Sequence, residues 1–220
     1  MIRQLRRSAV ALVAAGAMLA GLTACGTPAY TYATDSADQT YFKVPSSWPQ
    51  ASPLELLHVQ LVLGITPSGT DGTFTWVRAY DAAIHPSPIG LLIPRTPVVY
   101  ASVQDMKSSL RAALSFDQMR NLLFPVTPAA RHQAAAAGVT FTGFNLLINS
   151  TITTKYGVRG INELYEFSVR GQPVYFDQTA LTNSSTTKLY LLLVECDQKC
   201  FGSNLPQIKT VVQSFTVRGS

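Results

Sequence analysis

The alternation of apolar and polar residues predicts strands over much of the chain. Apolar and polar positions alternate along residues 73–80 and 160–170, which is the period of a strand buried on one face. Residues 189–194 are apolar without interruption, which indicates a strand covered on both faces. Further strands are expected at residues 40–45, 97–103, 139–153, 174–181 and 215–217.

Helices are predicted where capping residues bracket an apolar stripe. Residues 115–118 fit a capping box, and residues 127–138 combine an N-cap threonine, a first-turn proline and a terminal glycine. A last amphipathic helix is expected at about residues 204–213. The segment 54–65 fits either a strand or a short helix. Antiparallel strands with helices packed on them predict a single α+β domain over residues 40–220.

The first twenty-five residues have the pattern of an export signal. Three arginines precede an uncharged apolar stretch of about fourteen residues, which is shorter than the ~20 that span a membrane. Leu22-Thr23-Ala24-Cys25 follows, and it resembles the lipobox of bacterial lipoproteins, in which the cysteine is lipidated and becomes the new N-terminus. An ordinary secretory site prefers an Ala-x-Ala pattern of small residues, which Leu22 breaks.

The lipobox resemblance implies how the chain is divided and where it works. We expect a signal peptide at residues 1–24, lipidation of Cys25 and an acylated tether at residues 25–39. The protein would then be held on the extracytoplasmic face of the cell membrane by its lipid. No later apolar run approaches the length of a membrane span.

Removing the signal peptide also changes the charge. The whole chain has 17 basic and 12 acidic residues, and residues 1–24 hold three arginines and no acid. The remainder therefore carries 14 basic against 12 acidic residues, a net charge of +2. Binding to nucleic acid needs a basic stripe to neutralise phosphates, and no run rich in lysine and arginine occurs. We expect no nucleic-acid partner.

Cys196 and Cys200 are spaced C-x3-C, and outside the cytoplasm such a pair predicts a disulfide. It would fix the turn between a strand and the helix that follows. Two other interpretations are weaker. A thioredoxin-like motif has only two residues between its cysteines. A zinc site needs two more ligands, and the three histidines (His58, His85 and His132) lie far away in the sequence. We expect no metal and no cofactor.

Both ends of the expected domain resemble a known family. Residues 41–45 with Trp48 resemble the first strand of PsbP-like and Mog-like domains, and residues 208–217 resemble their final helix, Ser-Phe pair and closing strand. The likeness covers these ends and the strand order, and it implies an α/β/α sandwich. Actinobacterial lipoproteins of the LpqN type are similar in plan. Because members of this fold mostly bind proteins or stabilise assemblies, the resemblance favours a binding role.

Two groups of residues are candidate recognition sites. The first is a polar cluster of Arg159, Asn162, Glu163 and Glu166, which would line a recognition face at a sheet edge. The alternative is a turn that leads into a strand whose outward positions must be polar.

The second group is aromatic and lies near the tether. Tyrosine and tryptophan are enriched at interface hot spots, so these side chains are candidates for a binding surface. The alternative places the tryptophan in the core. The group consists of Tyr30, Tyr32, Tyr41 and Trp48.

The sequence holds no familiar catalytic motif. G-x-S-x-G, H-E-x-x-H, a Walker loop, a dinucleotide fingerprint and an EF-hand are all missing. We expect His58 in the core, His85 in a loop and His132 on the exposed side of a helix. The leading hypothesis is a non-catalytic binding or accessory module for an envelope protein, lipid or glycan. The alternative is an envelope hydrolase that uses one of the histidines or the polar cluster.

Overall fold

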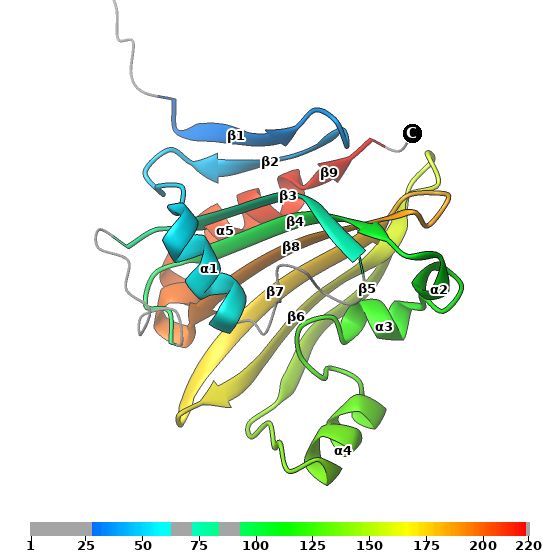
Figure 1. Ribbon diagram of the computed structural model, residues 1–220. Coiled ribbons are helices and arrows are strands. Elements are labelled where there is room, and N and C mark those ends of the chain that lie inside the picture. The colour runs from blue at the N-terminus through cyan, green and yellow to red at the C-terminus, as the bar shows by residue number, and fades with distance from the viewer. Residues whose placement is uncertain (1–27, 63–71, 84–92, 219–220) are drawn as a thin grey trace, which may run out of the picture.

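The computed structural model describes residues 28–62, 72–83 and 93–218 of the 220-residue chain. Its strands form two antiparallel sheets, and helices lie on both sides of the larger sheet (Figure 1). The strands are β1 (Tyr30–Asp35), β2 (Thr40–Pro45), β3 (Gly72–Asp81), β4 (Val98–Met106), β5 (Asn145–Thr153), β6 (Arg159–Val169), β7 (Gln172–Thr182), β8 (Lys188–Asp197) and β9 (Thr216–Val217). The helices are α1 (Pro53–Val62), α2 (Ser108–Arg111), α3 (Phe116–Arg120), α4 (Pro128–Ala136) and α5 (Gln198–Ser214). The predicted α+β class is confirmed.

The larger sheet has six strands in the order β3-β4-β8-β7-β6-β5. Strand β8 lies inside it and is buried from Leu189 to Cys196, as its uninterrupted apolar run predicts. Strands β6 and β7 form a hairpin through Arg170-Gly171, and both residues have the positive φ of a type I′ turn. Strands β3 and β5 are the two edges of this sheet.

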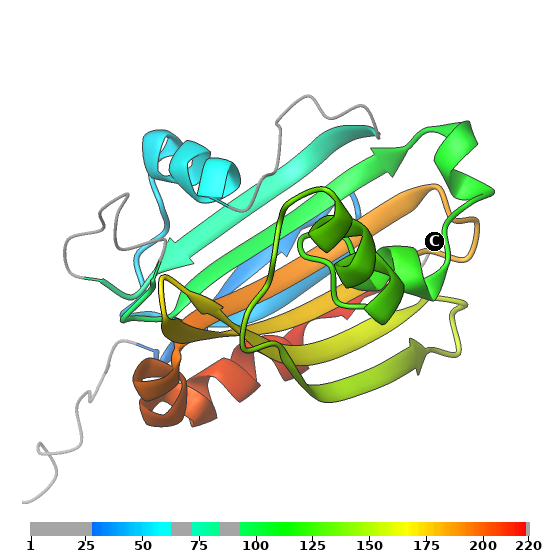
Figure 2. The ribbon, with the colours of Figure 1, turned by 90° about the horizontal axis from the view of Figure 1, so that it is seen from below.

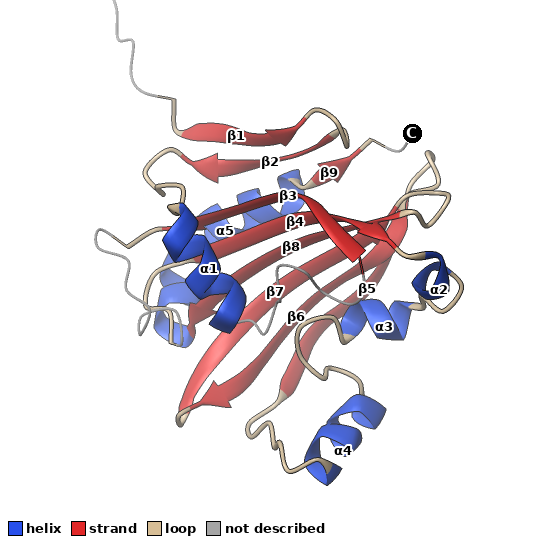
Figure 3. Cartoon of the chain, viewed as in Figure 1, coloured by secondary structure: helices blue, strands red, loops and turns tan. Residues whose placement is uncertain are grey.

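The smaller sheet has the order β1-β2-β9 and joins segments from opposite ends of the described chain. It lies on the same side of the larger sheet as α5, which contacts β2, β7 and β8 (Figure 2). Helix α5 turns an apolar stripe inward, in which Phe201, Ile208 and Val211 are buried. On the other side of the larger sheet lie α1, α3 and α4 (Figure 3).

Two hydrophobic cores result, one on each side of the larger sheet. The α5-side core joins the smaller sheet and α5 to the larger sheet and includes Phe42, Trp76 and Leu192. The α3-side core lies beneath α1, α3 and the loop after α3, and it includes Met119, Tyr165 and Leu193. Alternation along each strand divides the side chains between the two cores.

Local sequence signals predict most element boundaries. The capping box at Ser115 is present, and Thr127 caps α4 as expected. The ambiguous segment 54–65 contains helix α1. Helix α5 begins six residues before the expected 204, because Asp197 accepts a hydrogen bond from the Cys200 N–H and caps an earlier start.

Two expectations need correction. Part of the expected tether, residues 25–39, is strand β1, which pairs along its length with β2. The strand expected from residue 139 begins only at Asn145. The signal peptide and Cys25 lie outside the described residues, so lipidation stays a prediction.

Candidate functional site

The four residues of the predicted polar cluster do not share one face, so that prediction needs correction. They lie on β6, which is inside the sheet between β5 and β7 and is not an edge. Glu163 points to the same side as Ile161 and Tyr165 and is fully buried. Asn162 and Glu166 point to the opposite side and are half-buried. Only Arg159, at the start of the strand, is exposed.

Glu163 lies beneath helix α3, where Arg120 supplies a positive charge. Arg120 Nε is 3.1 Å from Glu163 Oε1, and the same N–H donates to Asn149 Oδ1 at 3.1 Å. Neither carboxylate oxygen of Glu163 accepts a hydrogen bond within the described chain. Burial raises the pKa of Glu163 to about 7, and the Arg120 charge opposes that rise. Glu163 is thus an internal ion-pair partner of α3.

The other three polar residues hold neighbouring strands and turns in place. Asn162 Nδ2 donates to Asp177 Oδ1 at 2.9 Å, across the β6–β7 pair. Burial raises the pKa of Asp177 to about 6, and this hydrogen bond opposes the rise. Glu166 accepts a hydrogen bond from Asn145 on β5, and Arg159 donates to Thr186.

Glu195 is a buried carboxylate that sequence reasoning missed. It lies on β8 at the α3 side, opposite Val98 and Phe176. Its Oε1 atom has no hydrogen-bond partner in the described part of the chain. Burial raises the pKa of Glu195 to about 8, and the nearby Asp81 carboxylate raises it further. The sequence did contain a signal for this site, because Glu195 directly follows a run of six apolar residues.

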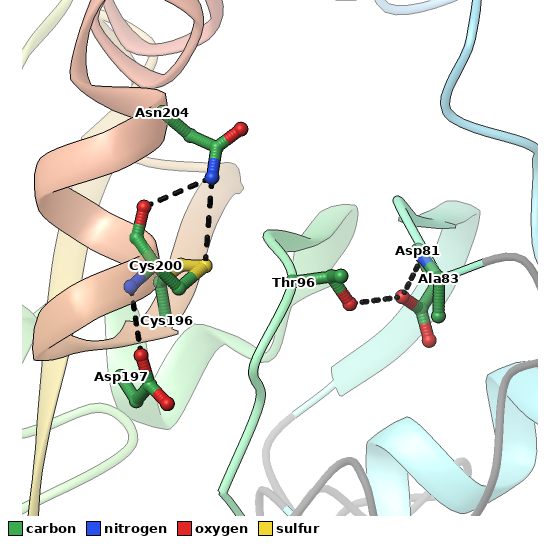
Figure 4. The surroundings of a disulfide bond; sticks show 7 residues. All are labelled: Asp81, Ala83, Thr96, Cys196, Asp197, Cys200 and Asn204. Carbon is green, nitrogen blue, oxygen red and sulfur yellow. Dashed lines mark hydrogen bonds between the residues drawn. A yellow bond between two sulfur atoms is a disulfide. The ribbon is translucent and has the colours of Figure 1, made fainter.

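The predicted disulfide is confirmed. Cys196 at the end of β8 is bonded to Cys200 in the first turn of α5, with their Cα atoms 5.7 Å apart (Figure 4). Asp197 Oδ1 accepts the Cys200 N–H at 2.8 Å, and Asn204 Nδ2 donates to the Cys200 carbonyl at 2.9 Å. The bond therefore clamps the strand to the helix, as expected. Among the described residues, no group of three or more His, Cys, Asp or Glu side chains is placed to hold a metal ion.

The histidines are separated. His58 lies on α1 and is half-buried, so it is less enclosed than expected. His132 is exposed on α4, as expected. His85 lies outside the described residues.

Edge strand β5 is the apolar surface that the sequence reasoning did not single out. Every residue from Asn145 to Thr153 except Ile152 is exposed, and none is charged or proline. Three consecutive apolar side chains, Leu146, Leu147 and Ile148, are 38%, 46% and 44% exposed. A β-bulge at Leu147 interrupts the pairing with β6. The run of three apolar residues at 146–148 was the available signal.

The aromatic group near the expected tether separates into core and surface. Trp48 is buried in the α5-side core, which was the alternative interpretation. Tyr32 is 59% exposed and contacts Tyr41 edge-on, with ring centroids 6.3 Å apart. Tyr30, Tyr32 and Tyr41 lie on the side of the smaller sheet that faces away from the core. They occupy the strand positions that alternate with those of the buried residues Ala33 and Phe42.

The architecture matches a solved structure over nearly its whole length. Cyanobacterial PsbP from Synechocystis aligns with 91% of this chain and 99% of its own, at 13% identity and a TM-score of 0.52. The chain has a PsbP-like fold. This result confirms the fold that the resemblance at the two ends implied.

Two further solved structures are more distantly similar. The Ran-binding protein Mog1p of Saccharomyces cerevisiae covers 86% of this chain and 96% of its own, at 9% identity and a TM-score of 0.43. LpqN of Mycobacterium tuberculosis, which is involved in cell envelope biogenesis, covers 88% of this chain and 87% of its own, at 12% identity and a TM-score of 0.42. No protein-family model matches the sequence, and no curated protein matches it. None of the described helices is both long and apolar enough to cross a bilayer.

Proposed function

We propose that the chain is a lipoprotein anchored through Cys25 on the extracytoplasmic face of the cell membrane, and that it is a non-catalytic module that binds another envelope protein along β5. The lipobox supports the anchor. The open, uncharged edge of β5 is the observation that carries the binding role.

The two edges of the larger sheet differ in a way that favours β5 as the binding edge. Part of the β3 edge is occupied, because Gln50 forms a bridge with Tyr80 and Asp38 accepts a hydrogen bond from Thr75. Soluble proteins usually protect an edge strand with charges, proline or a covering segment. Strand β5 has neither a charge nor a proline over nine residues.

An extended, mostly uncharged polypeptide segment is the partner that fits this edge. Such a segment adds as a further strand, and backbone hydrogen bonds supply much of its affinity. Leu146, Leu147 and Ile148 then give the apolar contact that selects the partner's side chains. The partner's strand would continue the six-stranded sheet beyond β5.

Site-specific crosslinking in intact cells tests the binding edge. A photoreactive residue replaces Leu147 on β5 or Thr73 on β3, which is an exposed position at the opposite edge. We expect one partner to be captured from position 147 and not from position 73. With that partner purified, Ile148→Lys should weaken binding at least about tenfold, because it places a charge on the pairing edge.

Several results would contradict this proposal. Equal capture from both edges, or unchanged affinity for Ile148→Lys, would exclude β5 as the site. Turnover in a panel of esterase, peptidase and glycosidase substrates that is lost in His58→Ala or His132→Ala would overturn the non-catalytic role. For the anchor, Cys25→Ser should move the protein from the membrane fraction to the soluble fraction. Retention with unchanged mobility on a gel would show that Cys25 is not lipidated.

A further inference from the structure

The outward side of the smaller sheet combines tyrosines with basic residues. Tyr30, Tyr32 and Thr34 of β1 share this side with Tyr41 and Lys43 of β2, because each is paired in register across the two strands. Thr216 of β9 is paired with Tyr41, and Arg218 follows two residues later on the same side. We call this surface the tyrosine face. Its described residues are Tyr30, Tyr32, Thr34, Tyr41, Lys43, Thr216 and Arg218.

The cations of the tyrosine face lie over its rings. Lys43 Nζ is 5.7 Å from the centre of the Tyr32 ring, and the Arg218 guanidinium is 5.7 Å from the centre of the Tyr41 ring. Strand alternation gives this face no acid among the described residues. The nearby Asp35 lies on the same side of β1 as the buried Ala33. Asp38 forms an ion pair with Lys188, whose Nζ is 2.7 Å from Asp38 Oδ1. The face is therefore aromatic and positively charged.

The anchor proposed above limits how far this face can be from lipid. Tyr30, the first residue of β1, follows Cys25 by five positions. A fully extended chain spans at most ~3.5 Å per residue, so β1 begins within about 18 Å of the lipidated cysteine. Helix α4 lies at the opposite end of the molecule from β1 (Figure 1). The smaller sheet is thus the part of the domain nearest to the bilayer.

We propose that the tyrosine face lies against the headgroups of an anionic bilayer, with Lys43 and Arg218 directed to lipid phosphates. Tyrosine is enriched where hydrocarbon meets water, because its ring is apolar and its hydroxyl is polar. A lysine or arginine near an anionic surface contributes about 1 kcal/mol. This inference rests on the proposed lipid anchor, and it fixes the orientation of the domain on the membrane.

Spin labels at two positions test this orientation in the acylated protein. With Cys25 acylated and Cys196 bonded to Cys200, a cysteine introduced by Thr34→Cys or Gln133→Cys is the one free thiol. Thr34 is exposed on the tyrosine face, and Gln133 is exposed on α4. The protein is reconstituted in vesicles of equal parts phosphatidylglycerol and phosphatidylcholine. The readout is the collision rate of each label with a water-soluble nickel chelate and with oxygen, which partitions into lipid.

We expect the label at position 34 to collide several-fold less with nickel than the label at position 133. The difference should disappear in the Cys25→Ser background without vesicles. Replacing both Lys43 and Arg218 with alanine should lower the ratio of docked to undocked protein about thirty-fold, as the loss of two such cations implies. The protection of position 34 should then fall although the protein still sediments with the vesicles.

Failure of this inference and failure of the anchor give different results. Equal nickel collision rates at positions 34 and 133, in protein that sediments with the vesicles and has the mass of the acylated form, would overturn the orientation and leave the anchor standing. Protection of position 34 that survives the double alanine variant would exclude the role of the two cations. An unmodified Cys25 by mass spectrometry would overturn the anchor, and the orientation with it.

Discussion

The two sides of the six-stranded sheet are built from the same strands but bury different chemistry. The α5 side is closed by apolar side chains and a disulfide, and its buried acid, Asp177, accepts a hydrogen bond from Asn162. The α3 side buries a cluster of aromatic rings together with three acids, Asp81, Glu163 and Glu195. Glu163 has only the ion pair with Arg120, and Glu195 Oε1 has no hydrogen-bond partner in the described chain.

Because of this difference, the two sides contribute differently to the pH dependence of the stability of the fold. Buried hydrocarbon stabilises both sides at any pH, because it carries no charge. A buried carboxylate without sufficient partners disfavours its own ionised form, so the stability of the fold becomes dependent on pH. We therefore expect a cavity on either side to destabilise the fold by a similar amount. The α3 side should carry most of the pH dependence between about pH 6 and 8, because the raised pKa values of Glu163 and Glu195 lie above that of Asp177 on the α5 side.

The largest expected effects come from adjacent residues of β8. Leu192 is fully buried in the α5-side core and Leu193 in the α3-side core. Leu192→Ala and Leu193→Ala should each lower the free energy of unfolding by about 3–5 kcal/mol, since each leaves a cavity. Chemical denaturation at several pH values measures both. A loss below about 1 kcal/mol for only one variant would show that the two sides are not equally well packed.

Glu195→Gln should stabilise the protein at neutral pH. Burial raises the pKa of Glu195 to about 8 from its usual 4.5, so the unfolded state releases this proton first as the pH rises. Glu195 therefore lowers the free energy of unfolding by an amount that is negligible below about pH 4, grows between pH 4.5 and 8, and is constant above that range. A glutamine side chain is neutral at every pH, so E195Q should gain roughly 3 kcal/mol at pH 7 and almost nothing at pH 4.

A matched control for this substitution is Glu166→Gln on β6. Glu166 is half-buried and lies on the opposite side of the sheet from Glu163. Denaturation curves from pH 4 to pH 9 for this variant measure the effect of the same glutamate-to-glutamine change at a position that is not fully buried. If E195Q leaves the pH dependence unchanged, Glu195 does not carry the neutral-pH cost assigned to it.

The smallest of these effects concerns the disulfide on the α5 side. Cys196 and Cys200 close a loop of about five residues, and an entropic crosslink of that length contributes roughly 2 kcal/mol. Replacing both cysteines with alanine should lower the free energy of unfolding by about that amount, independently of pH between 5 and 8. Measurement of free thiols in denatured, unreduced protein checks that the bond forms. Two free thiols would contradict it.

Local patterns predicted the elements that depend on neighbours in sequence. The caps at Ser115 and Thr127 and the strands on both sides of the Arg170-Gly171 turn were predicted because their signals lie within a few residues. The sequence predicts a tether where strand β1 lies, because this short segment becomes a strand only by pairing with β2. Such pairing is a tertiary property.

The candidate sites were harder to predict because their environment comes from distant segments. The alternation along β6 places Glu163 with Ile161 and Tyr165, but a charged residue there is usually expected to face water. The cation that accompanies it, Arg120, comes from a helix more than forty residues earlier. The pairing of Cys196 with Cys200 was predictable because only three residues lie between them.

The arrangement of the smaller sheet sets an order of events during synthesis and folding. Strand β2 lies between β1 and β9, so Thr40 and Tyr41 pair with residues that are made about 175 positions later. Phe42 likewise packs edge-on against Phe215, with ring centroids 6.4 Å apart. Contacts of such long sequence separation form late in folding. The β1–β2 hairpin therefore stays without its third strand until residue 217 has been synthesised, so the smaller sheet closes only after every strand of the larger sheet has been made.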